Sequence, residues 1–250
     1  AFFLNKNPKN YFLYVALILY FLILILTNER ANIIRGISAL FLFFIFVKIY
    51  KSKHKIVLIL LMLISAGLAI NFVDSVKHRF ITEIKFINAE IKELGIDNSN
   101  KKLIFNIIRF SNYGPHYITS FEIYKKNKIL GTGTKTFRKA CNDVSIDKYY
   151  EADISLTNIR CSTHPHQYYF EFLSDLGLIG FFLFLSFFLY LLYRIINSYY
   201  YTKSLVLLGS SVFFVVQLIP LLPTGSFFTS FGSTIFFVNL SIIFAYLKIK

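Results

Sequence analysis

Residues 161–180 read CSTHPHQYYFEFLSDLGLIG, and this stretch joins a polar segment directly to a long apolar one. His164, Pro165 and His166 stand immediately before the apolar run. Large apolar residues then cover most sides of a helix, while Glu171 and Asp175, four positions apart, share one polar stripe. The stretch therefore predicts a membrane helix that begins beside ionisable histidines. A helix cap at the lipid interface with incidental histidines is the simpler alternative.

The composition of the whole chain agrees with a membrane protein. Hydrophobic residues make up 56% of the 250 positions, with 30 Phe and 17 Tyr. A soluble domain of this length cannot bury so many large apolar side chains, and a membrane helix needs roughly 20 apolar residues. Six segments meet or approach that length: residues 11–27, 31–47, 56–73, 169–193, 204–222 and 228–247. We expect an all-α polytopic protein with about six transmembrane helices.

The positions of the lysines and arginines predict the orientation of these segments. If the six segments alternate in direction, ten cations fall on one side, which the positive-inside rule makes cytoplasmic. They are Lys6, Lys9, Lys48, Lys51, Lys53, Lys55, Arg194, Lys203, Lys248 and Lys250. Residues 1–73 then hold three transmembrane helices, 74–168 form a long and mostly helical external loop, and 169–250 hold three more. No basic cluster alternates with aromatic residues, so the net charge of +14 does not indicate nucleic-acid binding.

A short external turn separates the first two predicted spans and reads TNERANIIRG. Arg30 and Arg35 lie in it, against the positive-inside tendency. An arginine at the rim of a membrane is costly unless it is paired or functional. We therefore treat both as candidate site residues. The alternative is a local Glu29–Arg30 pair and an Arg35 side chain that reaches back to the membrane surface.

The long external loop has the periodicity of helices. Apolar residues recur every three or four positions over residues 74–94, which predicts an amphipathic helix. A short apolar piece at 103–110 contains Arg109. A further helix begins at Gly114-Pro115, because proline is tolerated in a first helical turn, and ends among lysines.

Three aromatic residues of that last helix, Tyr117, Phe121 and Tyr124, give it one face. Residues 129–133, ILGTG, follow it, with Arg138 a few positions later. A lone Gly-x-Gly is usually a tight turn, and the third glycine of a dinucleotide motif is missing.

Cys141 and Cys161 are the two cysteines of the chain, and both lie in the predicted external loop. An oxidising compartment permits a disulfide between them. Closing a loop of about 20 residues would contribute roughly 3 kcal/mol. The bridge would tie the segment around Arg138 to the base of the His164–His166 stretch. Two free buried thiols are the alternative.

The residues around His166 resemble the signature of the O-antigen ligase and O-antigen polymerase superfamily. The shared pattern is His-Pro-His, an amide, an aromatic residue, an acidic residue and Gly-Leu-Ile-Gly, with ten residues between His166 and Gly177. Gln167 stands where that superfamily usually has asparagine, and Asp175 stands where it usually has glutamate. Both replacements keep the functional group, an amide in the first case and a carboxylate in the second.

The resemblance extends over residues 27–180. An arginine in the turn before the second span matches Arg30, and the arginine of the external loop matches Arg109, with Arg138 as a second candidate. Members of the superfamily usually have about twice this length. Together with the first residue, which is not methionine, this leads us to expect the carboxy-terminal part of a larger protein. The apolar run after residues 1–10 has no signal-peptide cleavage site.

The resemblance implies an inverting, metal-independent glycosyltransferase of the bacterial inner membrane, with a site that faces the periplasm. The implied donor is a glycan on undecaprenyl diphosphate, and the acceptor is lipid A-core in a ligase or a second lipid-linked unit in a polymerase. The implied catalytic residues are His166, Arg109 and Arg30, and the candidate substrate-binding residues are Arg138, His164, Arg35 and Gln167. Arginine binds phosphate bidentately, and histidine exchanges protons near neutral pH. We expect membrane lipids as partners, and we expect no cofactor, no metal ion and no nucleic acid.

Other classes fit the sequence less well. A catalytic zinc usually needs three protein ligands, and no HExxH-type spacing accompanies His164 and His166. A serine hydrolase would need a Gly-x-Ser-x-Gly elbow, which is absent from the sequence. A lipid-glycan transporter fits the break at Pro220, Pro223 and Gly225, but transporters gather ionisable residues at mid-membrane. A structural subunit without chemistry has no need of His-Pro-His.

Overall fold

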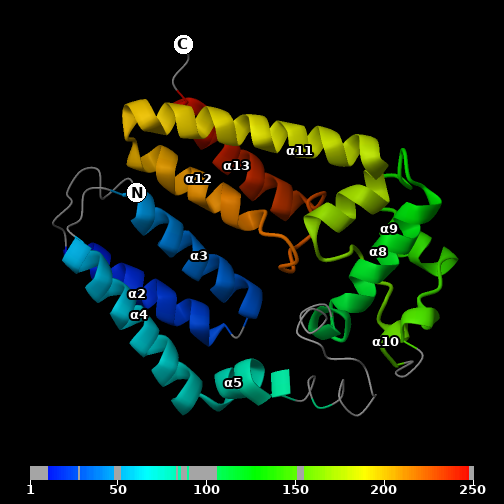
Figure 1. Cartoon of the computed structure of the whole chain (residues 1–250), viewed down its shortest axis with the longest axis horizontal. Helices are drawn as coiled ribbons and strands as arrows, with labels where there is room; N and C mark the ends of the chain where they lie inside the picture. The colour runs from blue at the N-terminus through cyan, green and yellow to red at the C-terminus, as the bar shows by residue number, and fades with distance from the viewer. Residues whose placement is uncertain are drawn as a thin grey trace. The chain divides into compact units, whose positions relative to one another are not determined.

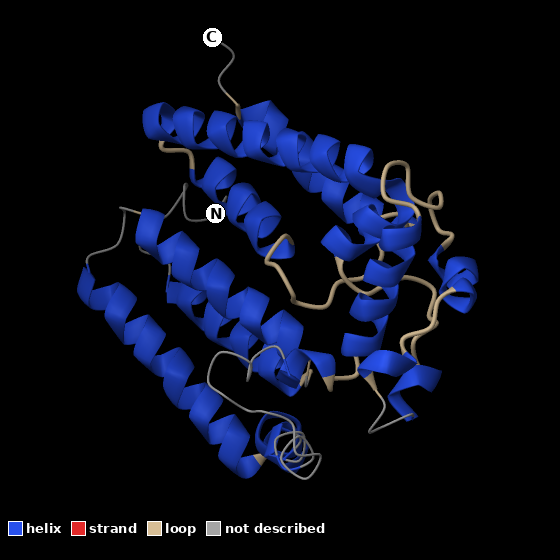
Figure 2. Ribbon diagram, turned by 45° about the vertical axis from the view of Figure 1, so that its right-hand side comes forward, coloured by secondary structure: helices blue, strands red, loops and turns tan. Residues whose placement is uncertain are grey.

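The computed structural model describes residues 11–27, 29–47, 52–82, 84–85, 89, 106–150 and 155–247. These residues form helices, turns and loops without a strand, as Figure 2 shows, which confirms the all-α prediction for the described part. By length and composition, one described helix, α11 (Tyr168–Thr202), can cross a membrane. Shorter apolar helices occupy Val15–Leu26, Ile59–Phe72, Leu205–Gln217 and Ser230–Tyr246. The six-span topology stays a prediction.

The chain divides into two compact units. Unit 1 contains residues 1–84, 191–219 and 236–250, and unit 2 contains residues 85–190 and 220–235. Two helices, α11 and α13 (Ser230–Tyr246), have residues in both units.

Unit 1 is built on helices that start close to the predicted spans, together with two short elements at the start of the predicted external loop. They are α2 (Tyr11–Leu26), α3 (Arg30–Phe46), α4 (Ser52–Phe72), α5 (Asp74–Lys77), the π-helical turn η1 (His78–Thr82) and α12 (Leu205–Gln217). Helices α3 and α12 pack together, and Phe21, Phe44 and Val212 belong to the core of the unit. The order of α2, α3 and α4 along the chain can be followed in Figure 1.

The predicted amphipathic helix at residues 74–94 is described only in part, as α5 and η1. Most of its remainder, the start of the 103–110 piece and six of the ten predicted cytoplasmic cations lie outside the described residues. These six are Lys6, Lys9, Lys48, Lys51, Lys248 and Lys250.

Unit 2 contains helix α8 (Gly114–Lys126), which the sequence predicted with both ends correct. Pro115 lies in its first turn, and Lys125 and Lys126 lie in its last turn, where cations interact favourably with the helix dipole. Short turns follow it: α9 (Phe137–Ala140), η2 (Cys141–Asp143), η3 (Asp147–Tyr149) and α10 (Ser155–Asn158).

The predicted aromatic face of α8 is not its most buried face. Phe121 is 42% exposed, whereas Thr119 and Ser120 are fully buried. The Ser120 hydroxyl donates a 2.7 Å hydrogen bond to the Phe170 carbonyl of α11, and Tyr117 stacks on the Phe170 ring. The small side chain of Ser120 therefore faces α11.

Helix α11 is broken near its beginning. Gly177 has φ 63° and ψ −163°, which is outside helical geometry. Residues 128–133, which we call the docked loop, supply the hydrogen bonds that the break removes. The amides of Leu178 and Ile179 donate to the carbonyls of Lys128 and Ile129 at 2.8 and 3.3 Å. In return, the amides of Thr132 and Gly133 donate to the carbonyls of residues 174 and 175 at 3.0 and 2.8 Å.

Candidate functional site

The backbone of His166 is held in an unusual conformation just before α11. Its φ is 57°, in the left-handed region that L-residues rarely occupy. Its carbonyl accepts a 2.7 Å hydrogen bond from the amide of Thr224, in the segment between α12 and α13. Strained residues of this kind persist only where the surroundings fix them, and they cluster at functional sites.

Three histidines gather at this point. The ring of His166 has its centroid 4.2 Å from that of His164 and 4.9 Å from that of His116. Tyr113 meets the His166 ring edge-to-face at 5.5 Å. The histidine cluster, defined as His116, His164 and His166, therefore joins the first turn of α8 to the segment that enters α11.

His116 is the residue that the sequence analysis missed. It is buried, and its Nδ1 lies 3.1 Å from the carbonyl of Arg160. Because a carbonyl only accepts hydrogen bonds, Nδ1 carries the proton and Nε2 of the neutral ring is left unprotonated. The sequence carries no local signal for it, because its partner, the Arg160 carbonyl, lies 44 positions away.

Burial keeps the histidine cluster uncharged. The pKa of His166 is lowered to about 4, first by burial and then by the neighbouring His164 and His116. Burial also lowers the pKa of His164, against the opposing effect of the Thr224 backbone, and that of His116, against its bond to Arg160. At neutral pH the rings can therefore accept a proton.

Glu171 and Gln167 support the position of His166. The Glu171 carboxylate accepts hydrogen bonds from the hydroxyl of Ser226 and, at 2.7 Å, from the amide of Phe227. The Gln167 side-chain oxygen accepts from the amides of Tyr169 and Phe170, so it caps α11. Both side chains are buried, and the predicted polar stripe of Glu171 and Asp175 thus binds loops instead of facing water.

The docked loop is fixed against the same part of α11. The Asp175 carboxylate accepts from the amide of Lys135 at 2.8 Å, and the amide of Gly131 donates to the carbonyl of Asn127 at 3.0 Å. The amides of Thr132 and Gly133 already donate hydrogen bonds to carbonyls of α11. These backbone N–H groups of the Gly-x-Gly turn are therefore occupied and do not form a phosphate-binding loop.

The loop arginines have different surroundings. The guanidinium of Arg109 lies 5.2 and 5.6 Å from the ring centroids of Phe110 and Tyr150, and its buried Nε has no hydrogen-bond partner among the described residues. Arg138 is exposed on α9. It stands three residues before Cys141, which forms a disulfide with Cys161 across a Cα–Cα distance of 5.5 Å.

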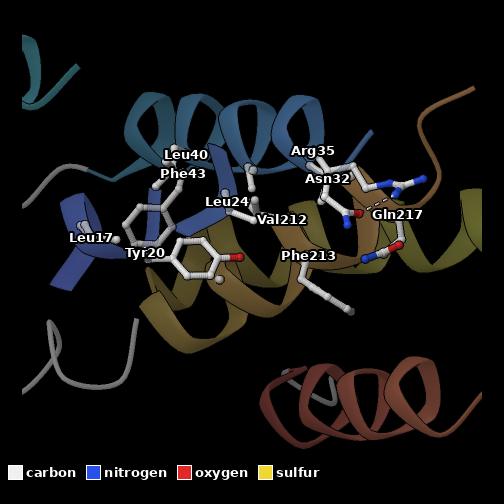
Figure 3. Close-up of a pocket in the computed structure, with 14 residues that line it drawn as sticks. Leu17, Tyr20, Leu24, Asn32, Arg35, Leu40, Phe43, Val212, Phe213 and Gln217 are labelled. Carbon is white, nitrogen blue, oxygen red and sulfur yellow. Dashed lines mark hydrogen bonds between the residues drawn. The ribbon is translucent and has the colours of Figure 1, made fainter. Parts of the chain in front are cut away.

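Arg30 and Arg35 belong to unit 1. Arg35 is buried and donates a 3.3 Å hydrogen bond to Asn32. Arg35 and Asn32 line a cavity of about 500 Å³, whose other walls are mostly apolar and include Leu24, Phe43 and Val212 (Figure 3). Arg30 is not among the residues that line it. That Arg30, Arg109 and His166 converge on one site stays a prediction.

The described residues contain no group of three or more His, Cys, Asp or Glu side chains arranged to hold a metal ion. The rings of the histidine cluster stand tilted against one another at 46–47°.

These features define a helical protein with a buried histidine site at the start of a long apolar helix. A scan against protein-family models matches residues 15–185 to the model described as O-antigen ligase, and the chain belongs to that family. The family consists of bacterial membrane proteins, generally enzymes of the glycosyltransferase type. No match was found among curated proteins or among solved structures.

Proposed function

We propose that the protein transfers a glycan from undecaprenyl diphosphate to a lipid A-core acceptor, with inversion at the anomeric carbon and without a metal ion. In this reaction His166 takes the proton from the acceptor hydroxyl as its oxygen bonds to the anomeric carbon. The bond from that carbon to the diphosphate oxygen breaks, and the diphosphate leaves with its electron pair. Arg109 and Arg30 stabilise the charge that develops on it.

The observation that carries the proposal is the setting of His166. A general base must be unprotonated at the working pH and fixed in position. Burial lowers the pKa of His166 to about 4, and the bond from Thr224 to its carbonyl fixes its backbone. The family supplies the reaction class, a transfer of lipid-linked glycan.

The cavity in unit 1 supports a lipid-linked donor. Its apolar walls suit a hydrocarbon chain, and its polar lining includes Asn32, Arg35 and Gln217. An arginine in the lining of such a cavity pairs well with a phosphate group. We assign Arg35 to the lipid phosphate, and Arg138, His164 and Gln167 to the glycan or the acceptor.

The proposed topology places the site in the periplasm. The chain would cross the inner membrane six times, with residues 74–168 outside and both ends of the segment inside. The external loop carries 15 Lys and Arg against 10 Asp and Glu, which suits an anionic acceptor such as phosphorylated core.

A polymerase is the alternative, because two diphosphate-linked substrates would suit the same basic loop. His166→Ala in a bacterial strain that makes both core and polymer separates the two. A ligase variant leaves long polymer on the lipid carrier and none on core, whereas a polymerase variant leaves single repeats on core. The control is His78→Ala, which removes an exposed histidine of η1. If His166→Ala changes neither pattern, His166 is not the base and the proposal fails.

A further inference from the structure

The docked loop has an apolar tip that the described part of the chain leaves exposed. Ile129 and Leu130 are 64% and 72% exposed, while the backbone around them is fixed on α11. Exposed apolar side chains on a rigidly held turn are costly in water, because the turn cannot fold back to bury them.

The hydrogen bonds set the level of this tip along α11. The carbonyl of Ile129 accepts from the amide of Ile179, so the two residues lie side by side. Ile179 is itself 50% exposed, and Phe182 and Leu183 continue the exposed apolar surface of the helix. The tip is therefore continuous with side chains of the helix that is long and apolar enough to cross a membrane.

The length of α11 allows its break to lie at the membrane boundary. About 25 residues follow Gly177 in the helix, roughly 37 Å at 1.5 Å per residue. The hydrocarbon core is roughly 30 Å thick, so this part is sufficient to span it. If residues 178–202 make the crossing, the part before Gly177, with its buried Glu171 and Asp175, lies outside the hydrocarbon core. The crossing is then shifted towards Thr202 relative to the span that the sequence predicted at residues 169–193.

We propose that Ile129 and Leu130 insert into the lipid bilayer at the boundary between headgroups and acyl chains. The exposed Lys128 is placed to meet anionic lipid phosphates beside the two apolar side chains. The lipid surface then holds the docked loop, and through Asp175 the start of α11, at a fixed height. This inference does not depend on which glycan the protein transfers.

Tryptophan fluorescence tests the insertion directly, because the chain has no Trp of its own. Leu130→Trp in the full protein, reconstituted in liposomes, should emit at short wavelength. Lipids brominated on their upper acyl carbons should quench it at least twofold, and aqueous acrylamide should quench it little. Ile159→Trp is the matched control: it replaces another exposed apolar residue of unit 2, which is not bonded to α11. Its emission should be quenched by acrylamide and not by brominated lipid.

Two outcomes would overturn the proposal. If Leu130→Trp is quenched by acrylamide and not by brominated lipid, as expected for Ile159→Trp, the tip lies in water. Short-wavelength emission without quenching by brominated lipid would show that protein, such as a second copy of the chain, covers the tip. If Leu130→Trp does not fold, Ile129→Trp is measured in its place, and the same two results contradict the insertion.

Discussion

His166 combines two properties that proton transfer requires, a fixed position and a neutral ring. A positive φ at a β-unbranched residue costs on the order of 1 kcal/mol or more. The bond from the Thr224 amide and the cap that Gln167 makes on α11 offset this cost from either side. The segment after α12, which contains Pro220 and Pro223, thus helps to orient the His166 side chain through the hydrogen bond from Thr224.

The lowered pKa of His166 predicts the pH dependence of activity. Burial disfavours the cation, so the free enzyme keeps an unprotonated base down to a pH of about 4. We expect kcat/KM to change little between pH 7 and pH 5 and to fall at lower pH. An acid limb centred at the ordinary histidine pKa of about 6.5 would contradict this. The free energy of unfolding should also fall with pH. Because the unfolded chain protonates His166 near pH 6.5 and the folded chain only near pH 4, this contribution to stability is lost as the pH falls from about 6.5 towards 4.

His116 should act as a positioning residue for His166. His116→Ala removes the donor to the Arg160 carbonyl and the ring beside His166. We expect kcat to fall at least tenfold with a smaller change in KM. His116→Asn restores a donor near the position of Nδ1 and should recover part of the rate. Equal losses in both variants, with unchanged pH profiles, would mean that the ring contributes only packing.

At the scale of single residues, the sequence predicted the residues that belong to a recognisable local pattern. His164-Pro165-His166 and the cysteine pair are visible without a structure, and the structure contains the Cys141–Cys161 disulfide. His116 was missed because a single histidine in a helix has no local signal. Its partner, the Arg160 carbonyl, lies 44 positions away in the chain.

At the scale of elements, the break in α11 depends on two glycines that face each other. A Cβ at Gly131 would lie 2.4 Å from the carbonyl carbon of Asp175, and one at Gly177 would lie 2.4 Å from the Ile129 oxygen. Both residues also have positive φ. The Gly-x-Gly turn and the Gly-Leu-Ile-Gly stretch are therefore two halves of one contact, which the sequence presents as separate motifs.

Gly131→Ala tests this contact. The left-handed backbone alone should cost about 1–2 kcal/mol, and the clash with α11 adds to it. We expect a less stable protein, faster proteolysis at the docked loop and loss of transfer. Gly225→Ala is the matched control in the same unit, because a Cβ there meets nothing within 4 Å. Equal stability and proteolysis rates for the two variants would show that the docked loop is not held by this approach.

The positions of the helices were predictable because apolar periodicity is a local property. The predicted segments at 11–27, 31–47, 204–222 and 228–247 begin within two residues of α2, α3, α12 and α13. Helix α11 extends nine residues beyond its predicted end, through Arg194 and Ser198. The break at Gly177 was not predicted, because the carbonyls that compensate for it come from residues 128 and 129.

At the scale of the whole molecule, the two units combine segments that are distant in the sequence. Unit 1 joins the first three long helices to parts of the last three, and unit 2 joins the loop residues to the start of α11 and to residues 220–235. The predicted division at residues 73 and 168 describes sides of a membrane, whereas the units describe packing. The boundaries of the packed units therefore do not test the predicted membrane sides, which stay a prediction.

Labelling of single cysteines tests the membrane sides. The two native cysteines are paired with each other, so one added cysteine provides a single free thiol. Ser99→Cys lies in the predicted periplasmic loop, and Ser52→Cys lies in the lysine-rich connection that the positive-inside rule places in the cytoplasm. In intact cells, a membrane-impermeant maleimide should label Ser99→Cys, and it should label Ser52→Cys only after the membrane is opened. The reverse pattern would invert the topology and move the histidine cluster away from lipid-linked glycans presented in the periplasm.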